Sequence, residues 1–312
     1  MQQDRVVPGR MTSLDRGQQG ARTVGVALRL GRVSNLPTVW TNALVGIALA
    51  GGQLWQAATL AVILALSLLY VGGMYLNDAF DREIDARERP SRPIPAGEAP
   101  ANTVFAAGFA MILAGTVTAL SAARLSDAGA VAGTVAAATA LAGMILAYDW
   151  RHKGNPWSPL LMGACRVLAY VTAALAIAGA APSAMLLAAA VALSYLIGLT
   201  YIAKQDSLGR LGSLWPLLFL AAPVAYGLWL LPTGGWALAA LLAAFGTWTA
   251  LALLLLWRRR PGDMPRAVVA LIVGIALLDA LFLAGSDELG GAALAIGCFA
   301  CTLALQRWIS GT

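Results

Sequence analysis

The sequence predicts an all-α protein, a polytopic transmembrane helix bundle of nine to ten helices. Of its 312 residues, 59% are hydrophobic and only 12% are charged. Soluble domains average about a quarter charged residues and under half apolar ones, so the chain has too little charge for a soluble fold. The apolar residues also gather into runs of about 20, the length of helix that crosses a bilayer. Backbone polar groups have no partners in lipid, which favours helices over open strands.

Ten apolar runs are candidate spans. The first is short, and the division between the fifth and sixth rests on Pro182, so we expect nine or ten helices. Before the first span, residues 1–27 are polar and lack the apolar core of a signal peptide, which predicts a mobile tail. Residues 28–312 are expected to form one transmembrane domain. The candidate spans lie near 36–52, 56–78, 101–123, 128–149, 158–181, 183–203, 214–231, 235–257, 266–284 and 289–308.

The charges support this division and give it an orientation. With ten spans, all of the 21 Lys and Arg residues except Arg124 and Arg166 fall on the side that holds both termini. Short cytoplasmic loops collect Lys and Arg, so we expect a multi-pass protein, of a bacterial inner membrane, with both termini cytoplasmic. The net charge of +6 then reflects topology rather than nucleic-acid binding. It would also attract anionic lipids or an anionic substrate to the cytoplasmic face.

Acidic residues gather where the second span ends. Asn77, Asp78, Asp81 and Asp85 follow one another at steps of one, three and four. At about 100° per residue, a helix places all four side chains within one quadrant. Carboxylates on one face repel each other unless a cation joins them, and Mg²⁺ typically takes one or two carboxylates together with substrate phosphates. The spacing therefore predicts a Mg²⁺-bridged diphosphate at this helix end, where the alternative is an ordinary solvated helix terminus.

A basic, proline-rich run follows the acidic residues. The sequence Arg89-Pro-Ser-Arg92-Pro-Ile-Pro cannot continue a helix, because proline removes a backbone donor and clashes with the preceding turn. We expect a stiff turn that directs Arg89 or Arg92 at a phosphate, which a guanidinium binds through two parallel hydrogen bonds.

At these residues the chain resembles the UbiA superfamily of intramembrane prenyltransferases, which carries Asn-Asp-x-x-Asp-x-x-x-Asp at the end of its second helix. The resemblance implies Mg²⁺-dependent transfer of a prenyl group from a prenyl diphosphate to a small acceptor. It assigns Asp78, Asp81 and Asp85 to catalysis, and these three with Asn77 to the metal. The stretches Leu36–Asn42 and Asn155–Gly163 are similar to the EboC-like branch, whose acceptors do not narrow the choice among aromatic, quinone-precursor, tetrapyrrole, sugar and polyol-phosphate types.

Two later segments extend the resemblance. The family has a tyrosine and a basic residue after its fourth helix, which Tyr148 and Lys153 resemble, and a second acidic motif at the end of its sixth helix. The resemblance implies that Tyr148 and Lys153 bind substrate and that Lys153 also takes part in catalysis. In that second motif only Asp206 remains as an acid, and we assign it to catalysis and metal binding. Lys204 adds a positive charge beside it, so a phosphate is expected there in place of a fully liganded second metal.

Other polar residues in the spans have open roles. Arg166 either pairs with Asp149 or Asp206 or binds substrate. Asn42 faces the cavity or bonds a neighbouring helix, and aromatic side chains such as Tyr148 and Tyr201 stabilise a cation or pack. Asp279 is expected to make a structural hydrogen bond, and His152 is expected to be a solvated loop residue, with a catalytic base as the alternative.

Three other functions compete with prenyl transfer. A membrane terpene cyclase would generate the same cation and capture it internally. A transporter would place its acids near the midplane of repeated halves, and no second half is evident. A non-catalytic member of the family would tolerate the reduced second acidic motif.

Overall fold

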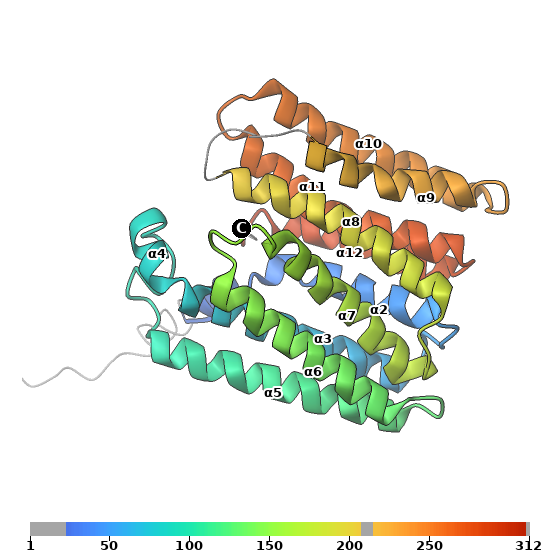
Figure 1. The fold of residues 1–312 in the computed structure, drawn as a ribbon, viewed down its shortest axis with the longest axis horizontal. Helices are drawn as coiled ribbons and strands as arrows, with labels where there is room; N and C mark the ends of the chain where they lie inside the picture. The colour runs from blue at the N-terminus through green and yellow to red at the C-terminus, as the bar shows by residue number, and fades with distance from the viewer. Residues whose placement is uncertain (1–22, 207–214, 310–312) are drawn as a thin grey trace, which may run out of the picture.

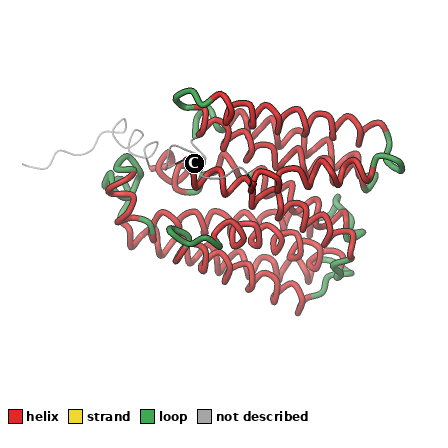
Figure 2. Tube along the Cα trace, turned by 45° about the horizontal axis from the view of Figure 1, so that its top comes forward, coloured by secondary structure: helices red, strands yellow, loops and turns green. Residues whose placement is uncertain are grey.

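The computed structural model describes residues 23–206 and 215–309, and within these ranges every regular element is helical (Figure 2). Ten helical segments correspond to the ten predicted spans. The fold prediction is therefore confirmed. The segments are α2 (Pro37–Leu49), α3 (Ala57–Phe80), α5 (Ala101–Leu125), α6 (Val131–Arg151), α7 (Ser158–Ala178), α8 (Ser183–Asp206), η2 with α9 (Trp215–Ala221 and Ala222–Leu230), α10 (Trp236–Arg258), α11 (Asp263–Gly285) and α12 (Leu289–Leu305).

Three shorter elements lie outside these ten. Residues 23–30 are helical, although residues 23–27 belong to the predicted tail, and residues 1–22 lie outside the described ranges. Leu30 of this segment is buried against Ala79 and Val104, which ties it to the bundle. The other two elements are the one-turn helix η1 (Val33–Asn35) and the short helix α4 (Arg82–Glu88).

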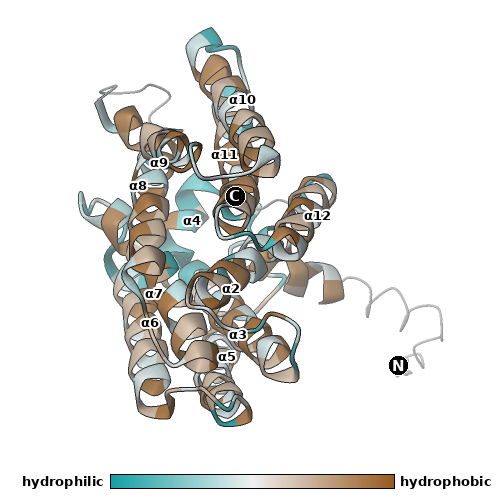
Figure 3. Cartoon of the chain, turned by 90° about the vertical axis from the view of Figure 1, so that its right-hand side faces the viewer, coloured by the Kyte–Doolittle hydropathy of each residue, from teal (hydrophilic) through white to brown (hydrophobic). Residues whose placement is uncertain are grey.

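Seven of the helices are long and apolar enough to cross a membrane: α3, α5, α6, α7, α8, α10 and α11. The remaining segments α2, η2 with α9, and α12 are shorter. All run roughly along one direction, so that the connections gather at two opposite ends of the bundle (Figure 1). Apolar colouring follows the helices along their lengths, and the polar residues concentrate at the ends and on α4 (Figure 3).

Exposed tryptophans mark both ends of this apolar band. Trp55, Trp229 and Trp236 stand at the end where α3 and α10 begin, and their exposed fractions are 69%, 66% and 82%. At the opposite end stand Trp150, Trp157, Trp215, Trp257 and Trp308. Tryptophan prefers the interface between lipid and water, so the two groups delimit a bilayer-spanning region. The chain is an integral membrane protein on this evidence.

The helix ends agree with the charge pattern. The C-terminal ends of α3, α6, α8, α10 and α12 lie together at the left of Figure 1, with α4 beside them. These are the ends next to which the sequence places nearly all of its Lys and Arg residues, whereas Arg124 ends α5 at the opposite side. The predicted two-sided distribution is thus present in the fold, and its cytoplasmic assignment stays a prediction.

Small residues allow the helices to approach closely. A Cβ added to Gly46 in α2 would lie 2.4 Å from the backbone oxygen of Tyr170 in α7. Gly72 in α3 and Gly108 in α5 meet in the same way, because each would bring a Cβ within 3.2 Å of the other's backbone oxygen. Such contacts replace the hydrophobic driving force that helices lack in lipid. The most buried of the spanning helices is α11.

We expect Gly46→Ala to lower the thermal unfolding temperature in detergent, with a loss of about 1–3 kcal/mol from overpacking against α7. Gly143→Ala in α6 is the matched control, because a Cβ there meets nothing within 4 Å. If both variants unfold at the wild-type temperature, the close approach of α2 and α7 is not rigid.

Candidate active site

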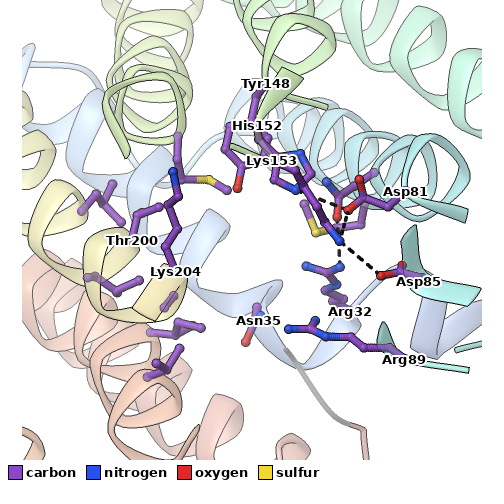
Figure 4. Close-up of a pocket in the computed structure, with 18 of the residues that line it drawn as sticks. Arg32, Asn35, Asp81, Asp85, Arg89, Tyr148, His152, Lys153, Thr200 and Lys204 are labelled. Carbon is purple, nitrogen blue, oxygen red and sulfur yellow. Dashed lines mark hydrogen bonds and ion pairs between the residues drawn. The ribbon is translucent and has the colours of Figure 1, made fainter. Parts of the chain in front are cut away.

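A cavity of about 470 Å³ lies at the end of the bundle where α3 and α6 terminate. One wall is polar and comes from α3, α4 and the segment after α6. The opposite wall comes from α8 and α11 and is largely apolar, with Leu196, Leu199, Val268 and Ile272 among its residues. Figure 4 shows Asp81 and Asp85 on the polar side and Thr200 and Lys204 across the cavity from them.

The predicted acidic face is present at the polar wall. Asn77, Asp78, Asp81 and Asp85 are all buried, with exposed fractions of 2–6%. Asp81 separates α3 from α4 yet keeps near-helical torsions, φ −80° and ψ −3°. Its amide donates to Asn77 O at 3.0 Å and its carbonyl accepts from the Asp85 amide at 2.8 Å. The helical register therefore continues through the break.

Three of these four side chains line the cavity, and Asp78 does not. Asp78 Oδ1 instead accepts from Arg32 Nη2 at 3.0 Å and from Arg92 Nη1 at 2.6 Å. Arg32 also donates to Asn77 Oδ1 at 3.1 Å, and Arg92 to Asp85 Oδ2 at 3.2 Å. Asp78 thus lies behind the cavity wall and holds two guanidinium groups that face into it.

The turn after α4 brings Arg92 back to the acids. The Arg92 amide donates to Arg89 O at 3.0 Å, and Gly97 takes the left-handed torsion φ 73° that closes the segment. Both Arg89 and Arg92 line the cavity, as the proline-rich run predicts. Burial and the neighbouring charge of Arg32 lower the pKa of Arg92, while Asp78 and Asp85 oppose that effect. Two cations are crowded here, which favours an anionic ligand.

Lys153 joins the carboxylates from the other side. Its Nζ lies 3.6 Å from Asp81 Oδ2, 3.5 Å from Asp85 Oδ1 and 3.5 Å from Glu88 Oε2, and the first two contacts are drawn in Figure 4. A single positive charge between three carboxylates shows that these oxygens face a common point. The predicted Lys153 is therefore at the centre of the polar wall.

The prediction that His152 is a solvated loop residue is wrong. Its side chain is only 16% exposed, its Nε2 lies 3.3 Å from Asp81 Oδ2, and its ring stacks on Tyr148 at 4.8 Å. A solvated loop residue is thus the wrong description. Burial alone would raise the pKa of Asp81, but the hydrogen bond and charge of His152 and the charges of Lys153 and Arg92 together lower it.

A second cavity of about 90 Å³ extends the first into the bundle. It lies between α2, α3, α6 and α7, and its lining is mostly apolar, including Val39, Leu66, Leu69 and Leu141. Both cavities share the lining residues Tyr70, Met74, Tyr148, Met162 and Arg166. The molecule therefore offers a charged outer cavity that narrows at these residues into an apolar inner one.

The remaining predicted residues divide between these surfaces. Lys204 lines the outer cavity and donates to Asn155 O at 2.6 Å and Ser158 Oγ at 2.9 Å. Asn42 lines the inner cavity, and Tyr201 lines neither. Asp206 ends α8, and its side chain lies outside the described part of the structure.

Arg166 does not pair with Asp149 among the described contacts, and a pairing with Asp206 lies outside the described side chains. Its Nη1 donates to Asn42 Oδ1 and to Thr38 O, the latter at 3.1 Å, and its Nη2 donates to Thr38 Oγ1 at 3.1 Å. Asp279 makes the expected structural hydrogen bonds, accepting from Thr41, Asn42 and Tyr170.

Sequence reasoning missed two contributors to the polar wall. The sequence shows Arg32 only as a positive charge before the first span. In the structure it donates hydrogen bonds to Asn77 and Asp78, which lie 45 and 46 residues later. Asp149 accepts from Asn77 Nδ2 at 3.2 Å and so turns the Asn77 oxygen towards Arg32. No local motif carries these contacts, since they appear only when α3, α6 and the segment before α2 meet.

The charged residues that line the outer cavity are mainly cationic. Among those the structure describes, six are Lys or Arg and three are acidic, with Asp78 adding a fourth acid behind the wall. This surplus of positive charge favours an anionic ligand. Magnesium also fits, because it needs only one or two carboxylates beside substrate phosphates, and Asp81 and Asp85 converge on one point. Within the described ranges no three His, Cys, Asp or Glu residues form a closed metal cage.

Comparisons with known proteins agree with this geometry. A digeranylgeranylglyceryl phosphate synthase from Methanopyrus kandleri is 34% identical over 131 residues, which cover 41% of this chain and 44% of that protein. The corresponding synthase from Methanothrix thermoacetophila is 34% identical over 93 residues, or 30% of this chain and 35% of that protein. The chain thus matches less than half the length of these curated relatives.

Solved structures share the fold. A structure of digeranylgeranylglyceryl phosphate synthase superposes with a TM-score of 0.59 at 18% identity, covering 85% of this chain and 99% of that one. The apo structure of a UbiA homologue from Aeropyrum pernix K1 gives the same score and identity, over 81% of this chain and 96% of that one. Residues 39–273, which contain the acidic helix end and both cavities except for Arg32, Asn35 and Ile275, match the UbiA prenyltransferase family. The chain therefore belongs to the UbiA prenyltransferase family.

Proposed function

We propose that this protein transfers a prenyl group from a prenyl diphosphate to an acceptor that carries a phosphate. The observation that carries the proposal is the connection of a cationic, acid-lined outer cavity to an apolar inner one. A prenyl diphosphate has the same two parts, a polyanionic head and a hydrocarbon tail. Its head belongs in the outer cavity, and its tail reaches past Tyr148 and Met162 into the inner one.

The polar wall supplies the groups that bind the diphosphate. Arg32 and Arg92 are held by Asp78, and Lys153 lies between Asp81 and Asp85. In this arrangement the guanidinium groups are already oriented before substrate arrives, which reduces the entropy lost on binding. When a diphosphate enters, it competes with the carboxylates for Lys153 and the arginines.

Asp81, Asp85 and Asn77 would hold Mg²⁺ in this proposal, with Asp78 acting through Arg32 and Arg92. Bound Mg²⁺ would neutralise charge on the diphosphate as it leaves. The position of Lys153 Nζ between Asp81 and Asp85 marks where these carboxylates accept a cation. Asp206 stays a predicted ligand and catalytic residue outside the described side chains.

The proposed reaction begins with ionisation of the prenyl diphosphate. The C1–O bond of the donor breaks, the electron pair leaves with the diphosphate, and an allylic cation remains. Arg32, Arg92 and Lys153 stabilise the negative charge that grows on the diphosphate. Such electrostatic stabilisation is usually the largest contribution of a preorganised site to catalysis. Tyr148, which lines both cavities, presents an aromatic face where the head meets the tail. The acceptor nucleophile captures C1 and gives up its proton.

The acceptor enters from the wall opposite the acids. Lys204 lies there, and the neighbouring surface of α8 and α11 is apolar. This combination suits an amphiphile with a phosphate head and a hydrocarbon tail. The synthases named for the matching relatives make digeranylgeranylglyceryl phosphate, so a polyol phosphate already bearing one geranylgeranyl group is the acceptor we propose.

We expect Asp81→Asn to reduce turnover of geranylgeranyl diphosphate at least 100-fold, because it removes the charge that holds the cation and leaves the volume unchanged. Product formation is measured by mass spectrometry in lipid nanodiscs, with and without EDTA. Asp127→Asn, at the opposite end of the bundle, is the matched control and keeps full activity. Full activity of Asp81→Asn, or wild-type turnover in EDTA, contradicts the metal assignment. A cyclic hydrocarbon formed without acceptor would instead identify a cyclase.

Lys204→Met tests the acceptor assignment. It should raise KM for geranylgeranylglyceryl phosphate about tenfold, the order expected for one charge-assisted hydrogen bond, and leave KM for the donor within twofold. Lys204→Arg keeps the charge and should retain most of the acceptor affinity. A rise confined to the donor KM would place Lys204 on the diphosphate and refute the assignment.

A further inference from the structure

A buried carboxylate lies outside both cavities, in the C-terminal third of α11. Asp279 is fully buried, and it follows a run of apolar residues in the most buried of the spanning helices. It also lies beyond the family match, which ends at residue 273. An ionisable side chain inside a membrane bundle is costly, so it calls for a specific role.

The contacts of Asp279 connect three helices. Its Oδ2 accepts from Thr41 Oγ1 and, at 2.7 Å, from Asn42 Nδ2, both on α2. Its Oδ1 accepts from the hydroxyl of Tyr170 on α7. Both oxygens are therefore satisfied, which explains how the group is tolerated. It does not explain why the position holds an acid, since a well-packed apolar side chain is often as stable.

The contact to Asn42 determines how its amide is turned. Asn42 has a guanidinium on one side, because Arg166 Nη1 donates to its Oδ1. It has Asp279 on the other side, as acceptor of its Nδ2. A guanidinium can only donate and a carboxylate can only accept, so one amide orientation alone satisfies both neighbours. With Asp279 in place, the amide oxygen must face Arg166.

Arg166 lies at the junction between the two cavities. It is among the five residues that line both cavities, and Thr38 holds its other donors. A substrate with an anionic head outside and a hydrocarbon tail inside has its C1–O bond at this junction. We propose that Asp279 is a positioning residue for the prenyl diphosphate, which acts through Asn42 to hold the Arg166 guanidinium at the junction. The inference rests on the proposed function.

The same arrangement occurs a second time in the site. Asn77 Nδ2 donates to Asp149 at 3.2 Å, and Asn77 Oδ1 accepts from Arg32 at 3.1 Å. In both places a buried aspartate turns an asparagine oxygen towards a guanidinium that lines the outer cavity. An aspartate–asparagine pair thus orients each of two cationic groups, and each pair joins helices that are distant in sequence.

The decisive experiment measures binding of geranylgeranyl thiodiphosphate, a non-transferable donor analogue, to purified protein in nanodiscs. Asp279→Leu removes the acceptor for Asn42 and should raise Kd about tenfold. Asp279→Asn keeps an oxygen that can accept from Asn42 and should stay within threefold of the wild type. Arg166→Gln should raise Kd at least tenfold, and the double variant of Asp279→Leu with Arg166→Gln should bind no worse than Arg166→Gln alone.

Thr41→Val is the matched control, because it removes a different donor to Asp279 and Thr41 lines neither cavity. It should leave Kd within threefold, with thermal unfolding recorded for every variant. If Asp279→Leu does not fold, Asn42→Ala breaks the same link from the other side and should be equally non-additive with Arg166→Gln.

Two results would overturn the inference: wild-type affinity in a folded Asp279→Leu or Asn42→Ala protein, or effects that multiply with Arg166→Gln. Wild-type protein that fails to bind the analogue at all would refute the proposed function instead. The binding assay on wild-type protein therefore separates the two failures.

Discussion

The structure depends on the burial of four oxygen-bearing side chains where α3 ends. Asn77, Asp78, Asp81 and Asp85 have exposed fractions of 2–6%, and such a concentration of acids would be untenable alone. Cations from three other parts of the chain make it stable: Arg32 before α2, Arg92 in the turn after α4, and Lys153 after α6. The acids thus organise the surrounding segments, and with Arg166 and Lys204 from α7 and α8 the cavity holds more positive charge than the acids neutralise.

This charge surplus links folding to function. Arg32, Arg92 and Lys153 are partly exposed and held in place by these carboxylates, so they form a surface complementary to phosphate. The other half of the site is apolar, because α2, α3, α6 and α7 enclose the inner cavity. In the proposed function, a substrate with a charged head and a hydrocarbon tail occupies both cavities, which share Arg166 and Tyr148 among their lining residues.

Helix existence, order and approximate bounds could be predicted from the sequence, because in lipid the length of an apolar run determines a span. The acidic helix end was equally accessible, since its spacing of one, three and four is a local property. The roles of Arg32, His152 and Asp279 were not, because each depends on contacts between helices far apart in sequence. His152 was misread for the same reason: the loop that contains it folds over Asp81 instead of into solvent.

The most direct measurement is a structure of the protein with geranylgeranyl thiodiphosphate and Mg²⁺ bound. The account predicts the diphosphate against Asp81, Asp85 and Lys153, with its C1 end beside Arg166 and its tail in the inner cavity between α2, α3, α6 and α7. A head group bound elsewhere, with Asp81 and Asp85 still paired only to Lys153, Arg92 and His152, would contradict it.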